Sequence, residues 1–232
     1  MTTPAVQQRP PRPKPLGVEI VAVLQREIIG GKFKPGQRLV ERELIHRFGI
    51  SSIPIREALQ ELQNRGLAVK RHNCGCSVVH LSRVEVARIC ELRRVLEPQV
   101  MEWAASRITE DGAERLELQF RELESAAKAK DYPRFFQEDL NFHRMIWLVA
   151  DNVYAIRALE TVMGSLFASG IIGSQHAKRL DLRAEVQKHR RLLDAISDSD
   201  GQRAALALLE IAAGFEKHLP RSYLTPVDNA GR

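Results

Sequence analysis

The sequence predicts a mostly α-helical fold, with an N-terminal winged helix-turn-helix followed by an all-α antiparallel six-helix bundle. Two patterns predict the first part: a helix–turn–helix centred on Gly49 and a β-hairpin shortly after it. Helical periodicity from residue 81 almost to the end of the chain predicts the second part. At 232 residues the chain is long enough for two domains that each bury a core.

Three helices are predicted before the hairpin. Apolar residues on one face indicate a helix over Leu16–Ile29, and further helices are predicted at 41–48 and 53–65. Ser51 or Ser52 can cap the third helix. This helix start directs backbone N–H groups outward, with Arg56 one turn further on, which suits binding to a phosphate backbone and a base edge.

The predicted hairpin pairs residues 67–71 with residues 76–80 across a turn containing Asn73 and Gly75. Lys70, Arg71 and His72 lie near its tip. Charge supports a nucleic-acid-binding role, because residues 1–80 contain 13 Lys+Arg and 6 Asp+Glu, which is 13 − 6 = +7. The remaining residues contain 22 Lys+Arg and 23 Asp+Glu, a net charge of −1. The two parts sum to the net charge of +6 of the whole chain.

From Leu81 onward we expect no strand. Capping and turn residues divide this part into six predicted helices: 83–107, 110–130, 132–150, 153–172, 180–197 and 201–219. Short links between them favour an antiparallel bundle around a common core.

Composition excludes several other classes of protein. No apolar run approaches the roughly 20 residues of a membrane helix, and the Pro- and Arg-rich N-terminus lacks an apolar signal core, so we expect a cytoplasmic protein. Cys74, Cys76 and Cys90 lack the second pair that a zinc site requires. We interpret them as free thiols, with redox sensing through Cys74 and Cys76 left as an alternative.

Asp139 and His143 are four residues apart, on one face of a predicted helix, where both can bind one ion. The rest of that helix is largely apolar, so the pair requires a partner if it faces the bundle core, and His189 on a later helix is the obvious candidate. A carboxylate with imidazoles suits a divalent transition ion such as Zn, Ni or Mn. The alternative is a surface hydrogen-bonding pair.

Several motifs together resemble the GntR family of bacterial transcription regulators, in the FadR-like subfamily with an FCD-type helical ligand-sensing domain. In the winged unit they are residues 31–39, Pro54-Ile55-Arg56-Glu57-Ala58-Leu59, Gly66-Leu67 and residues 73–75. In the bundle they are residues 92–98, Asp139-x-x-x-His143 with Asn152, and residues 189–196. The resemblance covers roughly Leu16 to Leu219.

The resemblance implies a homodimer that binds double-stranded operator DNA, with recognition helices in the major groove and wing tips at the minor groove. Arg38 and Arg56 would then contact phosphate or base edges, and Gly75 would let the wing approach DNA closely. The chain departs from the family where Arg and Thr usually precede the Pro-x-Arg-Glu run, since Ser52 and Ile53 stand there. Cys74 replaces the usual Arg before the wing glycine.

The resemblance also implies a metal held by one Asp and three His. Here Ile211 takes the position of the last histidine, and His218 lies seven residues later, about 10 Å further along the helix. Three alternatives stay open: a three-ligand site of Asp139, His143 and His189, a metal-free pocket, or a shifted site that uses His218.

A small effector is expected in the bundle, such as an organic acid, bound by Arg93 or Arg94 and by Asn152. Arg93 and Arg94 point about 100° apart on a helix, so only one of them faces the interior easily. Glu97, four residues after Arg93, offers the alternative of a helix-surface ion pair.

The sequence therefore predicts a ligand-responsive transcription regulator, with repression favoured, rather than an enzyme. The expected domains are a disordered basic arm (1–15), the winged DNA-binding domain (16–80), an effector-sensing and dimerisation domain (81–224) and a flexible tail (225–232). The alternatives are a metal-dependent hydrolase with Glu138 as base, another helical protein that binds small molecules, and an architectural DNA-binding protein.

Overall fold

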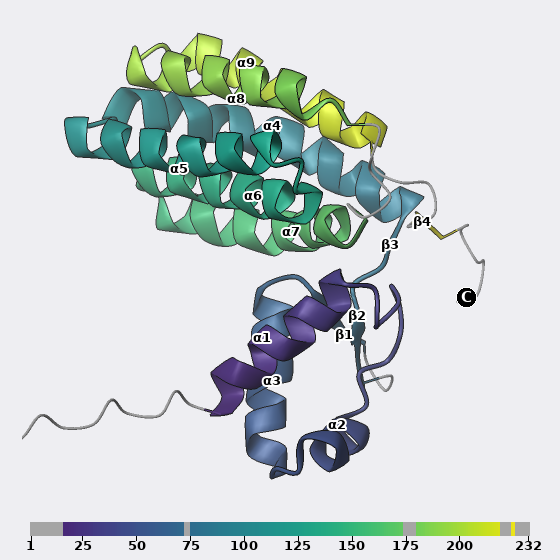
Figure 1. Ribbon diagram of the computed structural model, residues 1–232. Coiled ribbons are helices and arrows are strands. Elements are labelled where there is room, and N and C mark those ends of the chain that lie inside the picture. Colours follow the sequence, from purple (N-terminus) through teal and green to yellow (C-terminus); the bar gives the residue numbers. More distant parts are fainter. Residues whose placement is uncertain (1–15, 72–74, 174–179, 219–223, 226–232) are drawn as a thin grey trace, which may run out of the picture.

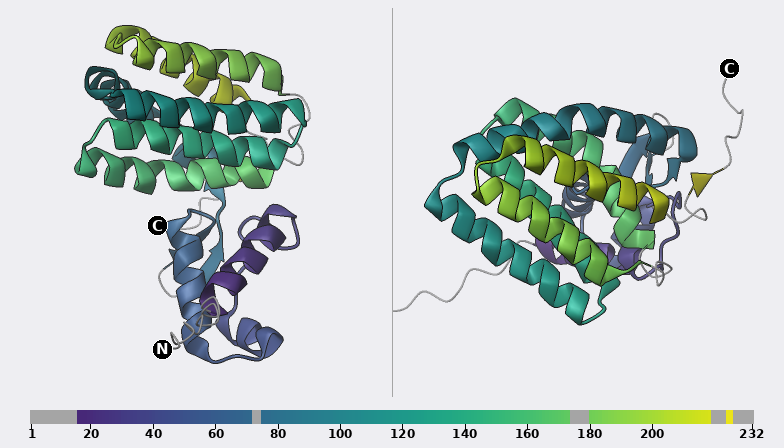
Figure 2. Two further views of the ribbon diagram at one scale, coloured as in Figure 1. Left: turned by 60° about the vertical axis from the view of Figure 1, so that its left-hand side comes forward. Right: turned by 90° about the horizontal axis from the view of Figure 1, so that it is seen from above.

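The structure is a computed structural model, and it describes residues 16–71, 75–173, 180–218 and 224–225. The side chains of residues 16, 71, 173, 215–218 and 224–225 are not among those described. The predicted N-terminal arm and residues 226–232 of the predicted tail lie outside these ranges. A helical bundle stacks on a smaller winged unit, which we call the head (Figures 1 and 2). The predicted fold class is confirmed.

The head contains three helices: α1 (Leu16–Ile29), α2 (Glu41–Phe48) and α3 (Ser52–Asn64). Helix α1 buries Ile20, Leu24 and Ile28, the face expected from its apolar spacing. Helix α2 ends at Gly49, whose φ of 64° lets the chain turn sharply into α3. The bounds of α1 and α2 coincide with prediction, whereas α3 lies one residue earlier.

The wing is a hairpin of β1 (Ala68–Arg71) and β2 (Gly75–Val78), paired antiparallel from Ala68↔Val78 to Arg71↔Gly75. Arg38 forms an isolated antiparallel bridge to Ser77 on the other edge of β2. The segment before α2 therefore lies beside the wing. Residues 72–74, at the tip of the hairpin, lie outside the described residues.

A short strand, β3 (Leu81–Ser82), connects the head to the bundle and pairs in parallel with β4 (Leu224–Thr225). The expectation of no strand after Leu81 was therefore wrong. A two-residue pairing across more than 140 residues of chain leaves no periodicity to detect. Ser82 also caps the first bundle helix in a capping box with Glu85.

Within the described residues, six helices form the bundle: α4 (Arg83–Arg107), α5 (Glu110–Lys128), α6 (Tyr132–Val149), α7 (Val153–Gly173), α8 (Leu182–Ser197) and α9 (Gly201–His218). Helix α4 lies beside α9, α5 beside α6, and α8 beside α9 (Figure 1). Helix α8 starts two residues later than predicted because the Asp181 side chain caps it, accepting from the N–H groups of Arg183 and Ala184.

Helix α7 lies on the side of the bundle nearest the head (Figure 1). Gly66, in the turn after α3, has a φ of 72° and packs against the main chain of Gly164 in α7. A Cβ on Gly66 would overlap the carbonyl group of Gly164, whereas a Cβ on Gly164 would stay 3.7 Å from the Cα of Gly66. The turn that ends α3 is therefore in direct contact with the bundle.

Helix α7 also corrects the expectation about apolar runs. Its segment Val153–Ile172 has a mean hydropathy of 1.4 and the length to cross a membrane, and 56% of the apolar window is buried inside the protein. Leu159, Met163, Leu166 and Phe167 belong to the hydrophobic core. Core packing thus explains the apolar character of this helix.

Candidate DNA-binding surface and metal centre

In the head, Arg38, Arg56 and Gly75 line one groove of about 520 Å³ between α3 and the wing. Gly75 has a φ of 75°, and a Cβ there would lie 3.6 Å from Nη2 of Arg38. The left-handed conformation and this close approach both favour glycine. The structure therefore places three of the predicted DNA-binding residues on a common surface.

The start of α3 differs from expectation in one detail. Ser51 occupies the N-cap position, but its side chain forms no capping hydrogen bond. Ser51 is exposed and Ser52 half-buried. Because the N-terminus of a helix carries unpaired N–H groups and partial positive charge, this end suits a phosphate oxygen.

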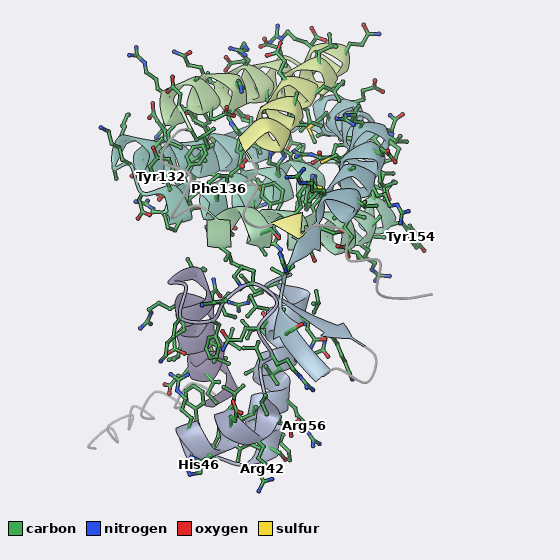
Figure 3. All side chains as sticks on the ribbon, turned by 90° about the vertical axis from the view of Figure 1, so that its right-hand side faces the viewer. Arg42, His46, Arg56, Tyr132, Phe136 and Tyr154 are labelled. Carbon is green, nitrogen blue, oxygen red and sulfur yellow. The ribbon has the colours of Figure 1, made fainter. Side chains whose placement is uncertain are left out.

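Arg56 projects from the first turns of α3, and its Nε donates to Oε1 of Glu41 at 2.7 Å. Arg42 and His46 of α2 lie with Arg56 at the end of the head farthest from the bundle (Figure 3). Arg42 and His46 are exposed and four residues apart, on one face of α2.

Sequence reasoning had not selected Arg42 and His46 as functional residues, nor two further residues that line the groove, Gln60 and Gln63. Lys70, expected near the tip of the wing, lines the same groove. For Gln60 a signal existed, because it follows Arg56 by four residues on the same helix. Arg71 ends β1, but its side chain lies outside the described part, as do His72 and Cys74 at the tip.

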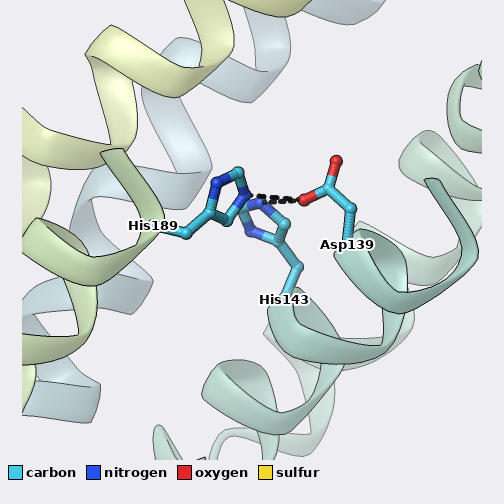
Figure 4. A group of neighbouring side chains, drawn as sticks. All are labelled: Asp139, His143 and His189. Carbon is cyan, nitrogen blue, oxygen red and sulfur yellow. Dashed lines mark hydrogen bonds and ion pairs between the residues drawn. The ribbon is translucent and has the colours of Figure 1, made fainter. Parts of the chain in front are cut away.

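In the bundle, α6 supplies Asp139 and His143, and α8 supplies His189, all buried (Figure 4). Their ligand atoms lie within 4.8 Å of one another. Nε2 of His189 is 2.8 Å from Oδ1 of Asp139, and Nε2 of His143 is 3.4 Å from the same oxygen. The structure thus brings together the three residues of the predicted three-ligand site.

The Asp139 carboxylate and the His189 ring stabilise each other's charged forms. Burial alone would raise the pKa of Asp139, but the neighbouring His189 and His143 outweigh it, so the pKa lies well below the ordinary value of an aspartate. Burial alone would lower the pKa of His189, but the charge of Asp139 and the hydrogen bonds to Asp139 and to the Glu185 carbonyl raise it. Without an ion, Asp139 and His189 form a buried charged pair.

The two histidines differ in their remaining contacts. Nδ1 of His189 lies 2.8 Å from the main-chain oxygen of Glu185, which only accepts, so this nitrogen carries a proton. Neither ring nitrogen of His143 has a hydrogen-bond partner within the described residues, although the ring is fully buried. Buried polar atoms usually have partners, so His143 has unused capacity to bind a ligand.

The three predicted effector residues differ in their surroundings. Arg93 is buried and Arg94 exposed, so only one of the two faces the interior, as expected. Arg93 donates from Nε to Oε2 of Glu97, which is also fully buried, so the interpretation of a helix-surface pair was wrong. Asn152 lies beyond the end of α6 and caps α7 by accepting from the N–H groups of Tyr154 and Ala155.

Two positions in α9 bear on whether the ion has a fourth protein ligand. Ile211, at the position of the family's last histidine, is buried in the hydrophobic core. His218 ends α9, and its side chain lies outside the described residues.

Comparison with known proteins assigns the chain to a family. The model of the gntR family of bacterial regulatory proteins matches residues 16–78, and that of the FCD domain matches residues 88–213. The chain belongs to the gntR family and carries an FCD domain. The expected resemblance is confirmed, and so is the prediction of a transcription regulator rather than an enzyme.

Two curated relatives and one solved structure illustrate how far this gntR-family protein has diverged. It is 27% identical over 197 residues to the HTH-type transcriptional repressor RspR of Escherichia coli, covering 85% of this chain and 86% of RspR. It is 24% identical over 220 residues to the galactonate operon transcriptional repressor of the same organism, covering 86% of this chain and 95% of that repressor. The E. coli McbR/YncC structure shares its fold, with a TM-score of 0.74 and 20% identity over 90% of this chain and 99% of that one.

Proposed function

We propose that this regulator is a cytoplasmic, ligand-responsive repressor. It binds operator DNA as a homodimer and holds a divalent transition ion, Zn, Ni or Mn, together with a small carboxylate effector in its bundle. Repression is supported by the names of its relatives, RspR and the galactonate operon repressor. The observation that carries the proposal is the buried group of Asp139, His143 and His189.

The residues present fit an ion. Two ligand atoms on one tetrahedral zinc lie roughly 3.3 Å apart, given Zn–N and Zn–O distances of about 2.0 Å. The spacings of 2.8 and 3.4 Å at Asp139 therefore need only small shifts. A bound ion would also engage His143, whose Nε2 has no other partner within the described part of the chain.

Three protein ligands leave at least one position for water or for a carboxylate oxygen. Galactonate, which appears in the name of one relative, is a carboxylate, and this favours an organic acid as effector. Of the three predicted effector residues, Arg93 alone is buried in the bundle, and an effector would compete there with Glu97.

The proposed homodimer is supported by apolar side chains on the surface of two adjacent helices. Leu92 and Val95 of α4 and Val153 and Tyr154 of α7 are exposed, with Tyr154 on the outside of the bundle (Figure 3). Packing of a second copy over α4 or α7 would remove part of this apolar area from water.

A contact route connects the ion site to the DNA-binding helix. The ring of Phe167 in α7 lies 5.7 Å from that of His143, centroid to centroid. One turn earlier in α7, Gly164 packs against Gly66, which directly follows α3 and Arg65. Effector binding that shifts α7 would therefore shift the head, and in a dimer it would change the spacing of the two recognition helices.

Metal titration tests the ion site. Purified protein, stripped with a chelator, is titrated with Zn²⁺, Ni²⁺ and Mn²⁺ by calorimetry, and the Asp139→Ala variant serves as comparison. We expect one ion per chain and loss of binding in the variant. Equal binding by both proteins, or no binding by the wild type, would contradict the site.

Footprinting on the DNA upstream of the protein's own gene tests the regulator. We expect a salt-sensitive protected site with two-fold symmetry, released by an organic acid. Gly164→Leu should change this release while leaving Zn²⁺ affinity unaltered, and Gly164→Ala, which has room for its Cβ, is the matched control. Unchanged release in Gly164→Leu would remove the contact route.

A further inference from the structure

We propose that Glu97 is a positioning residue for the ion site. Its carboxylate accepts the Nδ1–H of His143, so that Nε2, which is directed at Asp139, is the nitrogen that binds the ion. This inference rests on the proposed ion site, and it concerns how the chain prepares one of the ligands.

The geometry around His143 supports this role. Oε1 of Glu97 lies 3.9 Å from Nδ1 of His143, and both side chains are fully buried. Oε1 of Glu97 has no hydrogen-bond partner among the described residues, and neither has that nitrogen. A shift of about 1 Å would form a normal hydrogen bond and satisfy both atoms.

His189 shows the same arrangement with a different acceptor. Its Nδ1 donates to the main-chain oxygen of Glu185 at 2.8 Å, while its Nε2 faces Oδ1 of Asp139. Metal-binding histidines almost always donate their second ring N–H to a carboxylate or carbonyl group, which sets the tautomer and the ring orientation. The main chain performs this for His189, and the Glu97 side chain performs it for His143.

Arg93 completes the arrangement from the same helix as Glu97. Its Nε donates to Oε2 of Glu97, which balances a buried carboxylate charge and leaves Oε1 to face His143. Glu97 is not placed as a direct ligand, because its free oxygen faces Nδ1 of His143, whereas Asp139 faces Nε2.

The main variant is the double substitution Arg93→Met with Glu97→Leu. It replaces both members of the buried ion pair by apolar side chains, so the fold should survive. Glu97→Gln is the second variant, because a glutamine amide accepts from Nδ1–H or donates to Nδ1 and so no longer selects one tautomer. Glu160→Gln is the matched control, since the carboxylate of Glu160 pairs with Arg144 at 2.7 Å rather than with a residue of the ion site.

Two measurements decide the outcome. Zn²⁺ titration should show affinity about 10- to 100-fold weaker in the double variant, a smaller loss in Glu97→Gln and no change in Glu160→Gln. In metal-free protein, ¹⁵N chemical shifts of His143 should show a protonated Nδ1 in the wild type and an unprotonated Nδ1 in the double variant, where Asp139 remains as acceptor beside Nε2. Glu97→Gln should show a mixture of protonated and unprotonated Nδ1. A purely structural ion pair would leave the tautomer unchanged.

Failures of the two proposals are distinguishable. If the wild type binds no ion, the ion site fails, and the ¹⁵N measurement alone then tests the role of Glu97. If the wild type binds Zn²⁺ and the Glu97 variants match it in affinity and tautomer, the positioning role is overturned. If the double variant does not fold, Glu97→Gln gives both readouts.

Discussion

The head and the bundle each contain an Arg–Glu ion pair, and the two pairs differ in exposure. Arg56 and Glu41 meet on the surface of the head, with side chains 68% and 35% exposed, whereas Arg93 and Glu97 are 2% and 0% exposed. A surface pair contributes about 0–1 kcal/mol, but removing one partner of a buried pair costs about 3–5 kcal/mol. Arg56 can therefore exchange Glu41 for DNA, while Arg93 cannot easily leave Glu97.

The buried pair should give the largest effect on stability. Glu97→Leu alone leaves Arg93 without its carboxylate, and we expect a loss of about 3–5 kcal/mol in the free energy of unfolding, measured with urea. Adding Arg93→Met should recover most of this loss, because two apolar side chains replace the pair. A loss below about 1 kcal/mol in the single variant would show that Arg93 reaches another partner or water.

The surface pair should matter for DNA rather than for stability. Arg56→Ala should weaken operator binding by about 1–3 kcal/mol and change the free energy of unfolding by less than about 1 kcal/mol. Titration of labelled operator DNA and urea unfolding measure the two quantities. Arg65→Ala is the control, since Arg65 follows the other end of α3 and forms an exposed ion pair with Glu61, and it should leave DNA binding unchanged.

The pH dependence of stability should distinguish the bundle from the head. The pKa of Asp139 is lowered by folding, so its contribution is present above its unfolded value of about 3.9 and is lost as pH falls through the folded pKa. The pKa of His189 is raised by folding, so its contribution is complete below about 6.5 and is lost as pH rises through the folded pKa.

Without metal, the stability difference between wild type and Asp139→Asn should therefore be largest between about pH 4 and 6.5 and should decline on both sides. Urea unfolding at several pH values, with a chelator present, measures it. A difference that stays constant from pH 5 to pH 9 would show that His189 carries no extra charge in the folded protein.

The smallest expected effect belongs to Glu41. Glu41→Gln removes the competitor for Arg56, so operator affinity should rise by at most about fivefold, which corresponds to about 1 kcal/mol. A fall in affinity as large as that of Arg56→Ala would show instead that Glu41 orients Arg56 for DNA. Both variants are compared at the same salt concentration, because screening changes the competition.

The residues of the ion site differ in how far their positions could be predicted from sequence. The spacing of Asp139 and His143 follows from helical geometry, so both could be assigned to one face from sequence alone. His189 could be proposed as a partner but not placed, because it lies 50 residues further along the chain. Glu97 was missed as a neighbour of His143, since its burial depends on how α4 packs against α6.

The sequence by itself determined the helices of this protein and the wing hairpin, including the bounds of α1, α2 and α4, and the basic charge of the head. These depend on capping residues, apolar spacing and composition, which act within one or two helical turns. Only the tertiary structure decided which of Arg93 and Arg94 turns inward, that Glu97 faces His143, and that β4 returns to β3. The physical reason is that burial and long-range pairing arise from packing between distant segments, and the free energy of a charge depends on the water that such packing removes.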